Sequence, residues 1–140
     1  HVIEPNFGVD RTLLAILSEA FEEEKLESGE VRTVLHLNPS VAPYKVAVFP
    51  LLHNKEELVK KARTVYKDLK KYFPVYWDER GNIGKRYRYQ DEIGTPYCVT
   101  VDFDSLEKDD VTVRNRDTMK QERVKVKNLS QFLSDKIICS

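Results

Sequence analysis

The feature that most constrains the fold is an almost unbroken apolar run, Lys45–Leu51, followed by a helical stripe. The run reads Lys-Val-Ala-Val-Phe-Pro-Leu, without the polar alternation of a half-exposed strand, and this is typical of a strand buried on both faces. Apolar residues then recur at helical steps, at Leu58, Ala62, Val65 and Leu69. A buried strand followed by an amphipathic helix predicts an α/β unit.

Short apolar or alternating segments predict four more strands and two more helices. The strands are expected at Pro74–Asp78, Tyr97–Phe103, Val111–Arg116 and Glu122–Val126, and the helices at Ile83–Ile93 and after Asn128. Strands joined by helical crossovers run parallel, whereas strands joined by a short turn form an antiparallel hairpin. The sequence therefore predicts an α/β fold with a mixed, mostly parallel five-stranded sheet flanked by three helices.

A helix and a proline-containing loop precede this pattern. Apolar residues recur at helical spacing between Arg11 and Glu24, so we expect a helix that ends in a solvated run of glutamates. Residues 31–37 alternate enough for a strand or an extended linker. Pro39 and Pro43 make the next segment a loop. We expect a boundary there, with residues 1–40 as a helical tail and residues 41–140 as the α/β domain.

Charge and cysteine usage narrow the classes of function. The formal net charge of zero argues against a protein held on nucleic acid by bulk charge, so any basic surface must be local. Cys98 and Cys139 lack metal-ligand spacing, which favours a reduced, cytoplasmic setting and no metal site. No apolar run is long enough to span a bilayer. Because the chain starts at His1 rather than at Met, we expect it to be a piece of a longer protein.

Basic and aromatic residues alternate in the expected helix 83–93, and more cations follow at the end of a later strand. Such a mixture suits unpaired RNA, because cations meet phosphates while planar groups contact exposed bases. We expect these residues to converge at a strand end, as a local RNA-binding site: Lys85, Arg86, Arg88, Arg114, Asn115, Arg116, Asp117 and Gln121. The alternative is a solvated surface helix with Tyr87 against the sheet.

A second candidate site lies at the start of the chain, where a glycine turn precedes a helix. Gly8 allows close backbone approach, and Arg11 at the helix start offers a fork of donors for a phosphate or carboxylate. Glu4 could hold an amine. An ordinary strand-turn-helix corner would have the same spacing, so the residues alone leave both interpretations open.

Three blocks resemble a known family. Glu4-Pro5-Asn6-Phe7-Gly8-Val9-Asp10-Arg11 resembles motif 3 of class II aminoacyl-tRNA synthetases, in the form of the glycyl-tRNA synthetase family, although that family usually has Ser at the position of Asn6. Residues 81–104 and 113–121 are similar to the family's C-terminal anticodon-binding domain. The blocks occur in the family's order and approximate spacing across nearly the whole chain.

The resemblance implies a parent enzyme that activates glycine with ATP and magnesium and charges tRNA(Gly). Matched position by position, the glycine pocket would be lined by Glu4, Pro5, Asn6, Phe7 and Gly8. The ATP site would include Gly8, Val9, Asp10 and Arg11, with Arg11 as the catalytic cation on the triphosphate. The anticodon stem-loop of tRNA(Gly) would contact the RNA-binding residues named above.

The same resemblance limits what this chain does alone. It lacks the counterparts of motifs 1 and 2, so we expect no catalysis and no bound cofactor in isolation. The family's homodimer contacts lie largely in the missing part, which is compatible with a monomer. A competing interpretation is a non-catalytic relative, such as a polymerase accessory subunit. A small-molecule-binding α/β domain is disfavoured by the polar segments 85–88 and 114–121.

Overall fold

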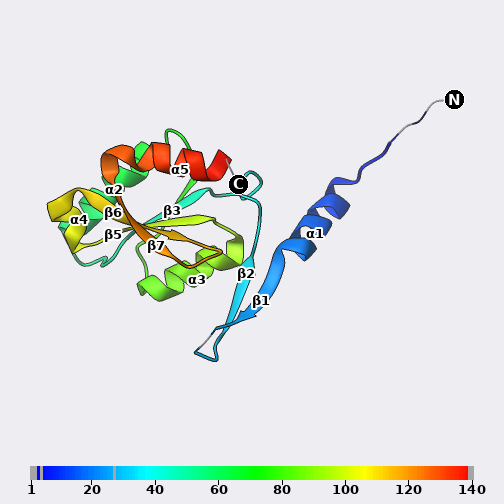
Figure 1. Ribbon diagram of the computed structural model, residues 1–140, viewed down its shortest axis with the longest axis horizontal. Helices are drawn as coiled ribbons and strands as arrows, with labels where there is room; N and C mark the ends of the chain where they lie inside the picture. Colours follow the sequence, from blue (N-terminus) through cyan, green and yellow to red (C-terminus); the bar gives the residue numbers. More distant parts are fainter. Residues whose placement is uncertain (1–2, 4, 27, 139–140) are drawn as a thin grey trace.

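The computed structural model describes residues 3, 5–26 and 28–138. Its first part holds a helix and a two-stranded antiparallel hairpin, α1 (Val9–Ala20), β1 (Phe21–Lys25) and β2 (Val31–Leu35). Figure 1 shows α1 projecting away from the rest of the molecule, while the hairpin lies beside the sheet domain. Most apolar side chains of α1 are accordingly exposed, and Ala20 at its end is its one buried residue among those described.

The second part is built on a five-stranded sheet with the strand order β4-β3-β5-β6-β7. Its strands are β3 (Val46–Pro50), β4 (Val75–Trp77), β5 (Tyr97–Val101), β6 (Asp110–Asn115) and β7 (Gln121–Lys125). β3 pairs in parallel with β4 and β5, whereas β6 pairs antiparallel with β5 and with β7. Only β6 therefore runs against the common direction within this sheet, which confirms the predicted mixed sheet.

Helices cover both faces of the sheet. α2 (Glu56–Leu69) and α5 (Leu129–Ile138) lie on one face, and α3 (Ile83–Ile93) lies on the other, beside the hairpin (Figure 1). The short α4 (Phe103–Lys108) follows β5, and a 3₁₀ turn, η1 (Val126–Asn128), leads into α5. Within the described residues, no helix has both the length and the apolar character needed to cross a membrane.

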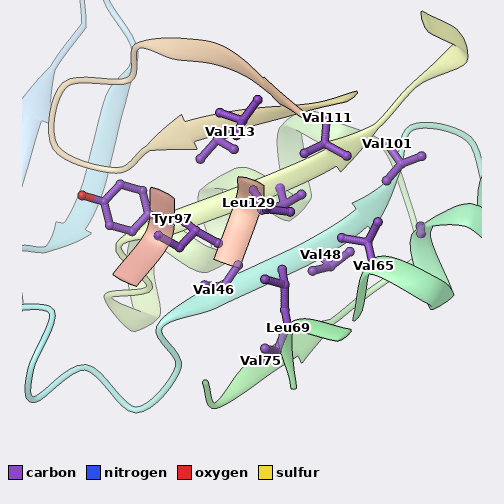
Figure 2. Packing of buried hydrophobic residues seen from close by; sticks show 14 of the residues in the cluster. Val46, Val48, Val65, Leu69, Val75, Tyr97, Val101, Val111, Val113 and Leu129 are labelled. Atoms are coloured by element: carbon purple, nitrogen blue, oxygen red, sulfur yellow. The ribbon is translucent and has the colours of Figure 1, made fainter. Parts of the chain in front are cut away.

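The alternating side chains of β3 supply both cores, as its sequence predicts. Val46 and Val48 point into the larger core under α2 and α5, together with Val65, Leu69 and Leu129 (Figure 2). Ala47 and Phe49 point the other way, toward Ile83 and Tyr87 of α3. All four strand residues are fully buried, and each large apolar side chain stabilises the fold by about 1.5–3 kcal/mol.

The predicted bounds of α3 are confirmed, and capping contacts fix both of its ends. Asn82 at the N-cap accepts a hydrogen bond from the Lys85 backbone N–H at 2.8 Å. Gly94 ends the helix with φ of +80°, a left-handed conformation that side chains other than glycine's disfavour. α3 is thereby fixed in length, and its last turn faces the end of β2.

The structure corrects the expected helix 11–24. The helix ends at Ala20, and Phe21–Lys25 is strand β1, paired with β2 from Phe21↔Leu35 to Lys25↔Val31. Glu24 has a specific partner in this arrangement, because Arg32 lies directly across the ladder. Cross-strand pairing thus overrides the helical propensity of the glutamates.

The starts of α4 and α2 differ in how they are capped. Residues 103–108 form α4, which Asp102 and Ser105 start with a reciprocal capping box. α2 begins at Glu56, with Lys55 at the N-cap and no side-chain cap bond.

Candidate nucleic-acid interface

The hairpin is attached to the sheet domain by buried ion pairs. Arg32 on β2 is 3% exposed and donates from Nε to Asp91 Oδ2 of α3 at 2.9 Å. It also donates from Nη1 to Glu24 at 2.8 Å and from Nη2 to the carbonyl oxygen of Arg116 at 2.5 Å. One guanidinium therefore joins β1, α3 and the end of β6.

Asp91 is the second centre of this network. Besides Arg32, its carboxylate accepts two hydrogen bonds from Arg114, at 2.8 and 3.0 Å. The Arg114 guanidinium also lies over the Tyr87 ring, 4.9 Å from its centroid. Burial opposes the charge of Arg114, but its hydrogen bonds to Asp91 outweigh this and raise the pKa of the guanidinium. The predicted RNA contact at Arg114 thus holds α3 against the sheet.

Two more arginines predicted as RNA contacts are likewise internal. Arg86, 2% exposed, donates to the carbonyl oxygens of Pro50 at 2.6 Å and Leu51 at 3.1 Å, and its burial lowers its pKa. Arg116, 3% exposed, donates to the carbonyl oxygen of Gly94 at 2.8 Å. The basic rim expected from the sequence is therefore not formed by these guanidinium groups, because carbonyls and carboxylates of the fold already hold them.

The remaining predicted RNA contacts are accessible, but they do not form one cluster. Lys85 is exposed in the first turn of α3, whereas Asn115, Asp117 and Gln121 lie in or beside the β6–β7 turn, near the other end of that helix. Arg88, also exposed, forms an ion pair with Glu30, just ahead of β2. The structure thus brings Asn115, Asp117 and Gln121 together and places Lys85 apart.

The β6–β7 turn is closed by its own hydrogen bonds. The Asn115 side-chain oxygen accepts from the backbone N–H of Thr118 at 2.9 Å and from its hydroxyl at 3.1 Å. The backbone N–H of Asn115 donates to the carbonyl oxygen of Lys120 at 3.0 Å. Met119 adopts a left-handed conformation with φ of +55°. These contacts hold the side chains of the turn on a short, defined loop.

A groove separates this turn from the tip of the hairpin. It has a volume of about 580 Å³ and is lined by Glu24, Lys25, Leu26, Ser28 and Met119. None of the first four lining residues was singled out by the sequence analysis, which expected this stretch to be a solvated helix end.

Asp117 is held more firmly than an ordinary turn residue. Arg116 donates to its carboxylate from Nε at 2.7 Å and from Nη2 at 3.1 Å, and His36 Nδ1 lies 2.7 Å from Oδ1. Partial burial opposes ionisation of Asp117, but the hydrogen bonds from Arg116 and His36 outweigh it and lower its pKa. Asp117 therefore presents a fixed, ionised acceptor.

His36 also contacts two glutamates of β1. In the structure its Nε2 lies 2.9 Å from Glu24 and 3.5 Å from Glu22, and these three ligand-type atoms lie within 4.8 Å of one another. The sequence predicted no metal site, and this group of side chains was not identified from it. The feature that could have revealed the group is the spacing of Glu22 and Glu24, which lie on one face once residues 21–25 are recognised as a strand.

The predicted glycine- and ATP-binding residues lie at the far end of the chain. Pro5, Asn6, Phe7, Gly8, Val9, Asp10 and Arg11 are all exposed around the start of α1, and Glu4 lies outside the described residues. Gly8 is the N-cap of α1, and its carbonyl oxygen accepts from Thr12 Oγ1 at 3.0 Å. These residues combine a helix N-terminus with one guanidinium, and both groups attract anions.

Comparison with known proteins gives a matching family and several close relatives. Residues 45–136 match the family described as "Anticodon binding domain". The chain is 54% identical over 133 residues to the glycine–tRNA ligase of Clostridium beijerinckii, which covers 95% of this chain and 28% of that relative. It is 54% identical over 137 residues to the enzyme of Clostridium kluyveri and 52% identical over 137 residues to that of Geobacillus kaustophilus.

Those two alignments each cover 98% of this chain and 29% of the relative. The chain thus spans less than a third of the length of the relatives it matches. The matched family segment, however, includes all five strands of the sheet, from Val46 to Lys125. By this match over most of its length, the chain belongs to the anticodon-binding domain family.

Proposed function

We propose that this chain binds the anticodon loop of tRNA(Gly) as part of a glycine–tRNA ligase. The observation that carries the proposal is the exposed β6–β7 turn, where Asp117 is held as a carboxylate between Arg116 and His36. The turn lies within the segment matched to the anticodon-binding family. High identity to glycine–tRNA ligases supports tRNA(Gly) as the RNA.

The chemistry of the turn suits the edges of unpaired bases. A carboxylate only accepts hydrogen bonds, so Asp117 favours a base that presents an amino donor, such as cytosine N4. Asn115 and Gln121 carry carboxamides, which both donate and accept. Glycine codons begin with two guanines, and the cytosines that pair with them in the anticodon offer the amino groups that Asp117 can accept from.

Positive charge has a smaller role in this proposal than in many RNA-binding proteins. Lys85 and Lys120 are exposed and can contact phosphates, whereas Arg86, Arg114 and Arg116 act by holding the fold in place. Because the chain carries no net charge and few exposed cations lie near the turn, we expect the isolated chain to bind RNA weakly, with the modest salt dependence that a few phosphate contacts produce.

For the whole enzyme we propose glycine activation with ATP and magnesium, followed by transfer of glycine to tRNA. Arg11 would act on the triphosphate, and residues 4–8 would contact glycine. We place the boundary between the catalytic part and the anticodon-binding part near residue 40. A cytoplasmic enzyme that forms a homodimer through its catalytic part completes the proposal, and the isolated chain is expected to be inactive.

The test is a titration of the chain with two RNA stem-loops at low salt. One carries the glycine anticodon, and the other differs only by uracil in place of each anticodon cytosine, which removes the amino groups. The proposal expects tighter binding of the first RNA. Equal affinity for both, or no binding of either, would reject it.

A further inference from the structure

His36 lies outside the segment matched to the anticodon-binding family, yet it contacts that segment at Asp117. It follows β2 directly, and its backbone N–H donates to the carbonyl oxygen of Ala20 at 2.7 Å, which extends the ladder between β1 and β2 by one residue. The hairpin therefore fixes the position of the imidazole. A shift of the hairpin would therefore move the imidazole relative to the Asp117 carboxylate.

The imidazole bridges two carboxylates. Its Nδ1 lies 2.7 Å from Asp117 Oδ1, and its Nε2 lies 2.9 Å from Glu24 Oε1. Carboxylate oxygens accept hydrogen bonds and imidazole N–H groups donate them, so the ring lies between two acidic side chains at hydrogen-bond distance. A hydrogen bond to a charged carboxylate is stronger than one between neutral groups.

The bridge closes a ring of contacts around the turn. Glu24 accepts from His36 with Oε1 and from Arg32 Nη1 with Oε2, at 2.8 Å for the latter. Arg32 in turn donates to the carbonyl oxygen of Arg116, the residue before Asp117. The backbone and the side chain at the start of the turn are thus both held by the hairpin.

This arrangement leaves one oxygen of Asp117 less engaged than the other. Oδ1 accepts from Arg116 Nε and lies against His36, whereas Oδ2 accepts a single, longer hydrogen bond from Arg116 Nη2 at 3.1 Å. The Asp117 side chain is 42% exposed. With Oδ1 fixed, the direction in which Oδ2 faces solvent is set by His36 together with Arg116.

We infer that His36 is a positioning residue for base discrimination, which orients the Asp117 carboxylate toward an amino-bearing base of the anticodon loop. The inference rests on the proposed function and deepens it. It assigns part of the specificity to a side chain from the hairpin, outside the matched domain. Without His36, Asp117 keeps its hydrogen bonds to Arg116 but loses the contact between its Oδ1 and the imidazole.

The experiment measures the ratio of affinities for the two stem-loops described above, at one salt concentration. The variants are His36→Ala, His36→Gln and Asp117→Asn, with His53→Ala as the matched control, because His53 is an exposed histidine in the turn before α2. We expect His36→Ala to lower the ratio by about five- to tenfold, with affinity for the uracil-containing RNA nearly unchanged. His36→Gln, which can still donate to Asp117, should recover part of the ratio, and His53→Ala should leave it as it is.

A double variant separates positioning from general damage to the fold. If His36 acts through Asp117, adding His36→Ala to Asp117→Asn should change the ratio no further, even where thermal stability falls. An unchanged ratio in His36→Ala, or equal further losses in both backgrounds, would overturn the inference. If the unaltered chain binds both RNAs equally, the proposed function itself fails, and that outcome is distinct from discrimination that survives the loss of His36.

Discussion

The carboxylate of Asp91 accepts two side-by-side hydrogen bonds from Arg114, and both residues are buried, at 1% and 6% exposure. The same carboxylate accepts from Arg32, so one negative charge serves two internal guanidinium groups. A buried charge that loses its partner is far more costly than a buried pair is favourable. The stability of the hairpin–domain contact therefore depends on Asp91 more than on any exposed ion pair of the chain.

We expect Asp91→Ala to lower the free energy of unfolding by about 3–5 kcal/mol, because it leaves Arg32 and Arg114 without their shared acceptor. Urea denaturation followed by circular dichroism measures the change. The control is Asp68→Ala, which removes a half-exposed pair with Lys71 and should cost less than about 1 kcal/mol. Equal effects of the two substitutions would show that the buried network is not a major source of stability.

Gly94→Ala should destabilise the chain for two separable reasons. The residue has φ of +80°, and an added Cβ would lie 2.7 Å from Leu37 Cδ1 and 3.1 Å from the carbonyl oxygen of Leu35. Gly81 has a similar φ of +70° but no atom within 4 Å of an added Cβ. Gly81→Ala thus isolates the backbone cost, about 1–2 kcal/mol, and Gly94→Ala should exceed it in the same denaturation assay. Equal losses would mean that the end of β2 moves aside freely.

The fold followed from local patterns to a large degree. The apolar run at β3, the stripe of α2 and the caps of α3 each specify an element through near neighbours in sequence, and they predicted the sheet and its covering helices. β1 could not be recognised in the same way. Residues 22–24 are three glutamates, and only pairing with β2 makes them a strand.

The burial of several arginines is the feature that the sequence alone could least predict. Arg32 and Asp91 are 59 residues apart, and Arg114 is 23 residues from Asp91, so nothing local distinguishes these cations from surface ones. An RNA-binding arginine and a buried structural arginine have the same residue type and the same helical or strand spacing. What decides between them is whether a carboxylate or carbonyl meets the guanidinium in the folded chain, which is a property of the tertiary structure.

Cys98 should be chemically inert while the chain is folded. The thiol is 1% exposed on β5, and burial raises its pKa to about 12, so little of the reactive thiolate is present near neutral pH. A Cys139→Ser variant leaves Cys98 as the single thiol of the sequence. We expect maleimide labelling of that variant to be very slow in buffer and rapid in denaturant. Fast labelling in buffer would show that the sheet opens around β5.

Acid should destabilise the chain through Asp102 and Asp117. Burial opposes ionisation of both, but hydrogen bonds from Arg123 and Ser105 lower the pKa of Asp102, and those from Arg116 and His36 lower that of Asp117. A folded pKa below the unfolded value of about 3.9 gives stability that is present above that pH and is lost as pH falls toward the folded pKa. We expect thermal stability to fall below about pH 4, and to fall less steeply in an Asp102→Asn, Asp117→Asn double variant. An identical pH profile in that variant would assign acid sensitivity to other groups.

Lys85 and Arg86 are neighbours on α3 with opposite expected roles, because one is exposed and the other donates to the Pro50 and Leu51 carbonyl oxygens. Lys85→Ala should weaken binding of both stem-loops alike and reduce the slope of log affinity against log salt by about 0.7, the contribution of one phosphate contact on a single strand. Arg86→Ala should instead lower the free energy of unfolding by about 2 kcal/mol or more, since two carbonyl oxygens lose a charged donor. RNA titration at several salt concentrations and urea denaturation measure the two effects on the same samples. A reduced salt slope in Arg86→Ala at full stability would restore Arg86 as a phosphate contact, and an unchanged slope in Lys85→Ala would remove Lys85 from the interface.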